Sequence, residues 1–342
     1  MRKIATCDAV GQRIAHDLTR IVPGVTKGRQ YKRGDIIRME DVEMMLSMGK
    51  DHIYVLEAED EGYIHENDAA MALAELCLND GMSVSDIKEG KVEILADRPG
   101  FFRVDTNRLY GLNMLGEMMI ATRKGNIPVD AGDRLAGMRI IPLMIEPEKL
   151  ERAKVIAEGD PIFELLPLRP LNVGIVITGN EVFYGRVKEG FTVVLEKKLA
   201  AFDMQMIHHE ICPDDLGVIS SAIQRARDAG AELIICTGGM SVDPDDYTPI
   251  AIRGSGAKVV TYGAPILPGA MSMLGYFADG TAIIGLPAGA LFMPITAFDI
   301  ILPYVSAGVE MTQEDFANLG YGGFCLNCQE CHYPNCQFGK GV

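Results

Sequence analysis

Short apolar runs alternate with amphipathic segments over the second half of the chain. Strands are predicted at Val173–Thr178, Met204–Ile211 and Glu232–Thr237, because these runs are short, largely apolar and bounded by turn residues. Apolar positions recur at helical spacing over Thr192–Phe202, and again in a helix that we expect Asp214 to cap. Buried strands that alternate with amphipathic helices predict an α/β fold, with a parallel sheet and helices on both of its faces.

The first half of the chain shows shorter and less regular patterns. They predict helices over Glu40–Met48, Ala69–Leu78 and Leu109–Thr122, and strands over His52–Leu56, Val92–Ala96 and Phe101–Val104. Methionines 114, 118 and 119 have helical spacing, which is typical of core packing. The acidic run Ala58–Asp68 is expected to be a linker. We predict four parts: a small α+β unit (1–57), a mixed α/β segment with a linker (58–170), the α/β domain (171–310) and a cysteine-rich tail (320–342).

Composition and charge indicate which kinds of partner the protein can bind. The chain has 342 residues, 48% of them hydrophobic, and a formal net charge of −15 at pH 7. This charge repels phosphate backbones and anionic lipids, so we expect neither nucleic acid nor a membrane as a partner. The N-terminal segment has no apolar run of signal-peptide length, and this predicts a cytoplasmic protein. An anionic ligand would be held by backbone N–H groups at glycine turns.

Two glycine turns follow the predicted strands. Thr178–Glu181 (TGNE) follows the first strand, and Thr237–Ser241 (TGGMS) follows the third. Ligands of such folds bind at the carboxyl ends of the parallel strands. Glycine lets the backbone approach a phosphate, and a neighbouring carboxylate binds a metal ion or takes a proton. The turns are therefore expected to line a binding site. The simpler alternative is that Gly238 and Gly239 only end a strand.

Four separated motifs resemble one known family. They follow the order found in the molybdopterin-binding domain of molybdenum-cofactor biosynthesis proteins of the Mog and MoeA type: TGNE from Thr178, TGGMSVDPDDYTP from Thr237, LPG from Leu267 and GLPAG from Gly285. The resemblance covers about Leu171 to Ala307. It implies molybdopterin as ligand or substrate, bound by Thr178, Gly179, Asn180, Thr237, Gly238, Gly239, Ser241, Pro268, Gly269, Pro287 and Gly289.

The resemblance also implies a reactive carboxylate. An aspartate at the place of Asp246 belongs to the reactive site of the family, and Glu181 and Glu189 are weaker catalytic candidates. Mg²⁺ is a candidate metal, and the implied activity is adenylyl transfer or molybdenum transfer to molybdopterin. The chain departs from the family at Asn180, where relatives have aspartate, and at Leu267, where the molybdenum-inserting branch has lysine. The simpler interpretation of Asp246 is a cap on the helix that follows it.

Three functions fit these motifs. The leading prediction is a molybdopterin-binding protein that acts in synthesis, maturation or delivery of the molybdenum cofactor. The second is a nucleotide hydrolase similar to the competence-damage-inducible family, which has a DD-x-T run like the one from Asp245. The third is a non-catalytic module that senses cofactor or redox state. Expected partners are a pterin or a nucleotide, together with molybdoenzymes or other cofactor-synthesis proteins, and the resemblance implies a homo-oligomer.

Four cysteines gather near the C-terminus with the spacing C-x2-C-x2-C-x4-C: Cys325, Cys328, Cys331 and Cys336. So dense a set of thiolates predicts a bound iron–sulfur cluster or zinc ion. A zinc site in which His332 replaces Cys331 is an alternative, as are disulfides or an unliganded tail. The glycines of Gly320–Gly323 predict a hinge that separates this module from the α/β core.

Overall fold

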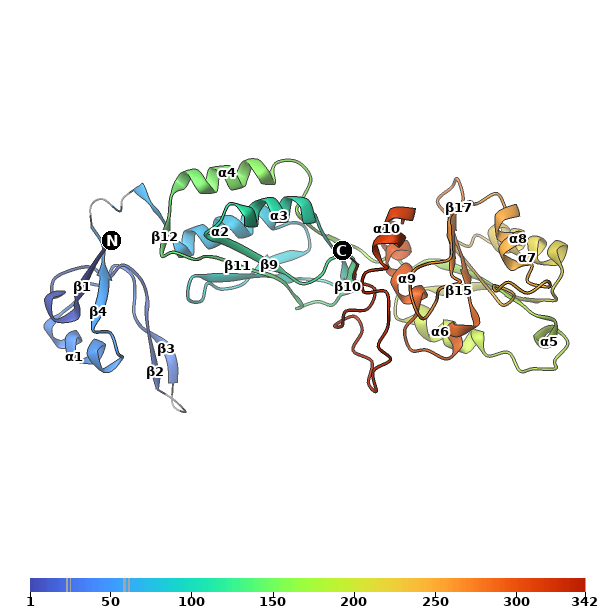
Figure 1. Cartoon of the computed structure of the whole chain (residues 1–342), viewed down its shortest axis with the longest axis horizontal. Helices are drawn as coiled ribbons and strands as arrows, with labels where there is room; N and C mark the ends of the chain where they lie inside the picture. Colours follow the sequence, from blue (N-terminus) through green and yellow to red (C-terminus); the bar gives the residue numbers. More distant parts are fainter. Residues whose placement is uncertain (23, 25, 58–59, 61, 342) are drawn as a thin grey trace. The chain divides into compact units, whose positions relative to one another are not determined.

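The computed structural model describes residues 1–22, 24, 26–57, 60 and 62–341 (Figure 1). The chain forms two compact units. Unit 1 comprises residues 1–95, 105–123 and 134–163, and unit 2 comprises residues 96–104, 124–133 and 164 onward. The chain therefore passes from one unit to the other five times, at 95/96, 104/105, 123/124, 133/134 and 163/164. Within the described ranges, no helix has both the length and the apolar character needed to cross a bilayer.

Unit 1 begins with a small α+β part. Its elements are β1 (Arg2–Ala5), η1 (Thr6–Asp8), β2 (Leu18–Val22), β3 (Thr26–Tyr31), α1 (Met39–Ser47) and β4 (His52–Val55). Strand β1 pairs with β4 and β2 pairs with β3, both antiparallel. Buried side chains that include Ile14, Ile37 and Met45 form a separate small core beneath these strands. The helix predicted near residue 40 and the strand predicted near residue 52 are both present.

The rest of unit 1 packs helices on a four-stranded sheet of order β6-β7-β11-β9. Its elements are β5 (Ile64–His65), α2 (Glu66–Cys77), β6 (Met82–Val84), β7 (Lys91–Ala96), α3 (Thr106–Met114), β9 (Met118–Thr122), β11 (Arg134–Ile140), β12 (Met144–Ile145) and α4 (Pro147–Ala157). The expected linker over residues 58–68 overlaps β5 and α2 at its end, and residues 58, 59 and 61 of it lie outside the described residues.

The helix predicted over Leu109–Thr122 is wrong in its second half. Helix α3 ends at Met114, and the chain then forms strand β9. Gly116 and Glu117 have positive φ angles of 71° and 59°, which end the helix. Met114 is consequently exposed, whereas Met118 is buried on the strand. Helical spacing of three methionines did not reveal this break, because the spacing also fits a helix end followed by a strand.

Unit 2 contains the larger core. A small sheet of order β10-β8-β13 precedes a six-stranded sheet of order β15-β14-β16-β19-β18-β17. The elements are β8 (Gly100–Val104), β10 (Ile127–Val129), β13 (Phe163–Leu166), β14 (Asn172–Thr178), α5 (Asn180–Phe183), α6 (Phe191–Ala200), β15 (Gln205–Cys212), α7 (Leu216–Asp228), β16 (Leu233–Thr237), α8 (Thr248–Gly254), β17 (Lys258–Tyr262), β18 (Met273–Tyr276), β19 (Ala282–Leu286), η3 (Ala288–Leu291), α9 (Ala297–Ala307) and α10 (Gln313–Asn318).

Strands β15, β14, β16 and β19 are parallel, and β18 is antiparallel to both β19 and β17. Successive residues of β14 face opposite sides: Ile175 and Ile177 pack in the core that includes residues of α6 and α9, while Val176 packs with residues of α7 and α8. Helices α6 and α9 lie on one side of the sheet, and α7 and α8 lie on the other (Figure 1). The predicted α/β fold with helices on both faces is therefore confirmed. The reversal at β18 makes the sheet mixed.

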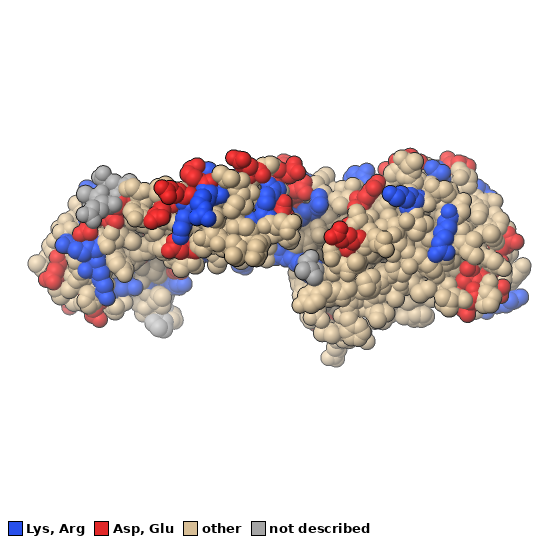
Figure 2. All heavy atoms as spheres, turned by 45° about the horizontal axis from the view of Figure 1, so that its top comes forward, with Lys and Arg blue, Asp and Glu red and all other residues tan. Residues whose placement is uncertain are grey.

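Charge is spread over the surface. Figure 2 shows basic side chains interspersed with acidic ones on the visible face of each unit. Several are close pairs, such as Arg103 with Glu164 (3.0 Å) and Arg227 with Asp279 (2.8 Å) in unit 2. Exposed pairs of this kind stabilise the fold only slightly.

Candidate functional site

The carboxyl ends of three parallel strands bring the predicted turns to one edge of the sheet. In register, Ile177 pairs with Thr237, and Thr237 pairs with Leu286. Strand β17 runs in the same direction as β19, because two antiparallel pairings separate them. The loop after β17 therefore lies at the same end. We call residues 178–181, 237–241, 263–269 and 286–289 the carboxyl edge.

The two threonine–glycine turns pack against each other. The Thr178 and Thr248 hydroxyls are hydrogen bonded at 2.9 Å, and the Thr237 hydroxyl donates to the Leu286 carbonyl at 3.1 Å. Gly238 has φ +93°, and a Cβ on it would lie 2.0 Å from the Thr178 carbonyl oxygen. Gly239 has φ +50°. Glycine at 238 is thus required by the packing of the turns, and its part in ligand binding stays a prediction.

Asn180 joins its turn to the segment before α7. Its backbone N–H donates to the Asp214 carboxylate at 2.8 Å, and its side-chain oxygen accepts the Asp214 N–H at 3.3 Å. The prediction that Asp214 caps α7 is wrong, because Asp215 accepts the Val218 N–H at 2.9 Å and is the N-cap. Asp214 is instead turned toward the carboxyl edge.

Carboxylates surround this edge. Burial raises the pKa of Asp214, the Asn180 N–H opposes that shift, and the charges of Glu181, Asp246 and Asp245 raise the pKa further. Three neighbouring carboxylates therefore act on Asp214. An anionic ligand at this place needs a cation as a co-ligand, because like charges repel strongly at a partly buried site.

Asp246 does not cap the helix that follows it. Its carboxylate accepts the Asp243 N–H at 3.1 Å, and the cap of α8 is Tyr247, which makes no side-chain capping bond. Its Oδ1 lies 3.5 Å from the position of a Cβ on Gly239, so it faces the glycine turn. Glu189 is engaged elsewhere: its carboxylate accepts the Thr192 N–H at 2.8 Å, at the start of α6.

Sequence reasoning missed a tyrosine that joins two parts of the edge. The Tyr262 hydroxyl, at the end of β17, donates to the carbonyls of Met240 (3.0 Å) and Ser241 (3.1 Å). The guanidinium of Arg253 lies over the Tyr262 ring, 5.1 Å from its centroid. Burial is the main cause that raises the pKa of Tyr262, and the Asp246 charge adds to it. The pairing depends on strand order, so no local sequence signal identifies it.

The remaining predicted binding residues lie on the other turns. Gly269 has φ +115°, and its Cβ position is 2.6 Å from the Ala297 Cβ, while the Pro268 carbonyl accepts the Ala297 N–H at 3.1 Å. Pro287 is the N-cap residue of η3. Gly289 has open space around its Cβ position. These turns follow β17 and β19, and their contact with a ligand stays a prediction.

The C-terminal tail, residues 320–341, is part of the packed unit. The Leu267 N–H donates to the Gly323 carbonyl, and the Cys325 N–H donates to the Leu267 carbonyl, both at 2.8 Å. Phe338 is 2% exposed and belongs to the main core. A Cβ on Gly323 would lie 2.2 Å from the Pro265 carbonyl oxygen. The predicted hinge at Gly320–Gly323 is therefore wrong: the glycines allow close packing and do not separate the tail from the core.

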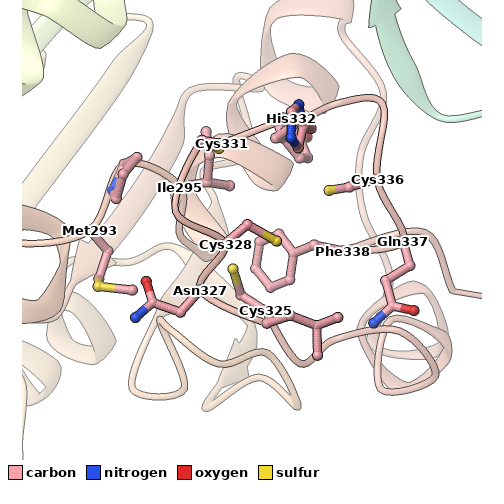
Figure 3. Close-up of a pocket in the computed structure, with 13 residues that line it drawn as sticks. Met293, Ile295, Cys325, Asn327, Cys328, Cys331, His332, Cys336, Gln337 and Phe338 are labelled. Atoms are coloured by element: carbon pink, nitrogen blue, oxygen red, sulfur yellow. The ribbon is translucent and has the colours of Figure 1, made fainter.

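The four tail cysteines line one cavity of about 60 Å³, together with His332. All four are free thiols; Cys325 and Cys336 are half-buried, and Cys328 and Cys331 are exposed. Figure 3 shows the sulfurs of Cys325, Cys328 and Cys336 around the same space beside Phe338. Among the described residues, however, no three His, Cys, Asp or Glu side chains are arranged to hold a metal ion. The structure thus brings the cysteines to one cavity without forming a ligand set.

Comparisons with known proteins agree with the predicted domain. Residues 174–307 match the family described as "Probable molybdopterin binding domain", and residues 3–57 match a family described as "Domain of unknown function". The resemblance predicted for residues 171–307 is therefore confirmed.

Among curated relatives, a CinA-like protein of Mycobacterium avium (strain 104) is 32% identical over 88 residues, which are 25% of this chain and 20% of that protein. A CinA-like protein of Mycobacterium leprae is 33% identical over 75 residues, 22% of this chain and 18% of that protein. The chain thus matches about a fifth of the length of these relatives.

Two solved structures are also similar. The molybdopterin biosynthesis enzyme MoaB of Thermus thermophilus is 21% identical with a TM-score of 0.34, over 42% of this chain and 99% of that chain. The molybdopterin biosynthesis Mog protein of Mycobacterium ulcerans is 20% identical with a TM-score of 0.33, over 39% of this chain and 91% of that chain.

Proposed function

We propose that residues 171–310 bind molybdopterin and that the protein acts in synthesis, maturation or delivery of the molybdenum cofactor. The match of residues 174–307 to the molybdopterin-binding family carries this proposal. The convergence of the predicted turns at one edge supports it, because that edge is where open α/β sheets bind their ligands.

The carboxyl edge suits a phosphate held through a divalent cation. Backbone N–H groups of the Thr237–Gly239 turn would face the phosphate, since glycine leaves the backbone accessible. Asp246 and Glu181 would share a Mg²⁺ ion with the phosphate oxygens, because Mg²⁺ is commonly bound by one or two carboxylates plus a substrate phosphate. In such a site the ligand phosphate supplies the remaining oxygen ligands of the metal ion. If the protein is a transferase of adenylyl groups or molybdenum, Asp246 is the carboxylate that we expect to act in it.

A second candidate is a nucleotide hydrolase. The curated relatives are CinA-like proteins, and the run Asp245-Asp246-Tyr247-Thr248 places Thr248 in a hydrogen bond with Thr178. A third candidate is a non-catalytic module that senses cofactor or redox state. Mass spectrometry of the small molecule that remains bound to the protein purified from its own cells separates the first two. A pterin supports cofactor synthesis or sensing, whereas a nucleotide contradicts both.

Asp246→Asn tests whether the proposed site is catalytic. If Asp246 holds the metal or takes a proton, turnover of the bound ligand falls roughly a hundredfold while the thermal midpoint stays close to that of the wild type. Asp228→Asn is the matched control, because Asp228 is the last residue of α7 and lies away from the carboxyl edge. Equal turnover in Asp246→Asn and the wild type would remove Asp246 from the reaction.

We also propose that the tail cysteines bind an iron–sulfur cluster or a zinc ion. Their spacing supports this, as does the cavity that they share. Binding would draw the sulfurs closer together. Anaerobically purified protein should then contain iron with acid-labile sulfide, or near-stoichiometric zinc, and the variant with all four cysteines changed to serine should lose it. Cys7→Ser is the control, since Cys7 is an exposed free thiol outside the tail. A metal-free anaerobic preparation would refute the site.

Four further assignments belong to this proposal. Free cysteines and a biosynthetic role favour the cytoplasm. Delivery of the cofactor requires molybdoenzymes or other cofactor-synthesis proteins as partners. A homo-oligomer is proposed by resemblance to the family, and light scattering of the purified protein tests it. The chain is proposed to divide into the parts 1–57, 58–170 and 171–310, with the tail 320–342 as the metal module.

A further inference from the structure

The tail adds an exposed apolar surface to the carboxyl edge. Leu267 and Phe324 are partners in a parallel β-bridge, and the backbone hydrogen bonds on either side of Leu267 hold the two segments together. Both side chains are exposed, at 52% and 63%. Leu267 directly precedes Pro268 and Gly269, which are predicted to bind the cofactor. Leu267 and Phe324 therefore form an exposed apolar pair beside a turn that is predicted to bind the ligand.

Side chains alternate along the tail segment that forms this bridge. Phe324 and Leu326 are each 63% exposed, whereas Cys325 between them is half-buried against the core. This period of two is that of an extended chain, so Phe324 and Leu326 lie on the outer face and Cys325 on the inner face. An extended, hydrogen-bonded segment holds an aromatic ring in place better than a free loop does. Exposed apolar side chains that lie next to one another mark an interaction site more often than isolated ones do.

We propose that Phe324 and Leu267 form an apolar platform on which the planar heteroaromatic ring of the ligand stacks. This inference rests on the proposed binding of a pterin and names the residues that hold its ring. The phosphate end would lie at the threonine–glycine turns and the ring end at the platform. Aromatic side chains stack on flat heterocycles with little dependence on ring substituents. Leu267 lies within the matched residues 174–307 and Phe324 lies outside them, so the aromatic half of the platform is supplied by the tail.

Direct titration with pterin-6-carboxylate, followed by the fluorescence of the pterin, tests the platform. Phe324→Ala should weaken binding about tenfold, which is within the range measured for removal of an aromatic stacking partner. Tyr321→Ala is the matched control, because Tyr321 is a tail aromatic at 77% exposure that lies outside the bridge. Equal affinity of Phe324→Ala and the wild type would overturn the platform.

The absence of tryptophan from the chain permits a second readout. In Phe324→Trp, the new indole should become less accessible to acrylamide quenching when pterin-6-carboxylate is added, whereas the indole of Tyr321→Trp should not. Gly239→Val separates the two levels of the proposal, since it alters the phosphate turn without touching the tail. Because pterin-6-carboxylate has no phosphate, Gly239→Val should bind it about as well as the wild type, whereas Phe324→Ala should not. If the wild type does not bind pterin-6-carboxylate, the platform is wrong, while the proposed function is judged separately by the small molecule that co-purifies with the protein.

Discussion

The threonine–glycine turns and the C-terminal tail both depend on glycine, for different physical reasons. Gly238 has a positive φ and also lacks room for a Cβ, so it is constrained by conformation and by space. Gly323 has an ordinary backbone conformation but no room, because the Pro265 carbonyl oxygen lies 2.2 Å from its Cβ position. Glycine therefore marks close approach at both places and flexibility at neither. The two sites should differ in how strongly a substitution destabilises the protein. Backbone strain adds to steric overlap at Gly238, whereas overlap acts alone at Gly323.

The largest effect is expected at the turn. Gly238→Ala combines left-handed strain with overlap of the Thr178 carbonyl, so we expect a loss of roughly 4 kcal/mol in the free energy of unfolding. Gly230→Ala is the control, because Gly230 has φ +89° with nothing within 4 Å and should lose only about 1 kcal/mol. Urea unfolding followed by circular dichroism measures both. Equal losses would mean that the packing of the two turns contributes nothing.

A smaller effect is expected in the tail. Gly323→Ala introduces overlap without left-handed strain, and overpacking of this kind costs roughly 2 kcal/mol. The tail should detach before unit 2 unfolds, so the Leu267 and Cys325 amides should exchange with solvent faster. Gly254→Ala should leave both amides protected, because its Cβ position is open. Unchanged exchange in Gly323→Ala would restore the idea of a flexible hinge.

The smallest effect concerns the acidic side of the carboxyl edge. Burial, with the charges of Glu181, Asp246 and Asp245, raises the pKa of Asp214 above its usual 3.8. The folded state therefore carries a penalty for the ionised group, which is fully present at neutral pH and fades as the pH falls through the raised pKa. Asp214→Asn should unfold at a slightly higher temperature than the wild type at pH 7, with the difference shrinking toward pH 4. A difference that grows on acidification would contradict this sign.

Local chemistry in the sequence predicted much of the edge and little of what joins its parts. The strands that end at Thr178 and Thr237 could be predicted from the sequence, because buried parallel strands are short and apolar, and glycine follows both of these. The antiparallel return of β18, and with it the bond from Tyr262 to the Met240 carbonyl, depends on pairing between distant segments. The prediction of a hinge in the tail was wrong for a related reason. Glycine is common both in hinges and where segments pack closely, and only the atoms that surround it in the fold distinguish the two.

Five crossings between the two units have a consequence for cutting the chain apart. Strands β8 and β10 belong to unit 2, although residues of unit 1 precede, separate and follow them. No single peptide cleavage therefore yields two fragments that each contain one whole unit. A fragment that starts at Glu164 lacks Phe101, which is fully buried in the main core and lies 4.8 Å from the Tyr304 ring, centroid to centroid. A contiguous segment that carries only the molybdopterin-binding part would lack Phe101 and leave a gap in its core, so we expect it to be less stable than the same part within the whole chain.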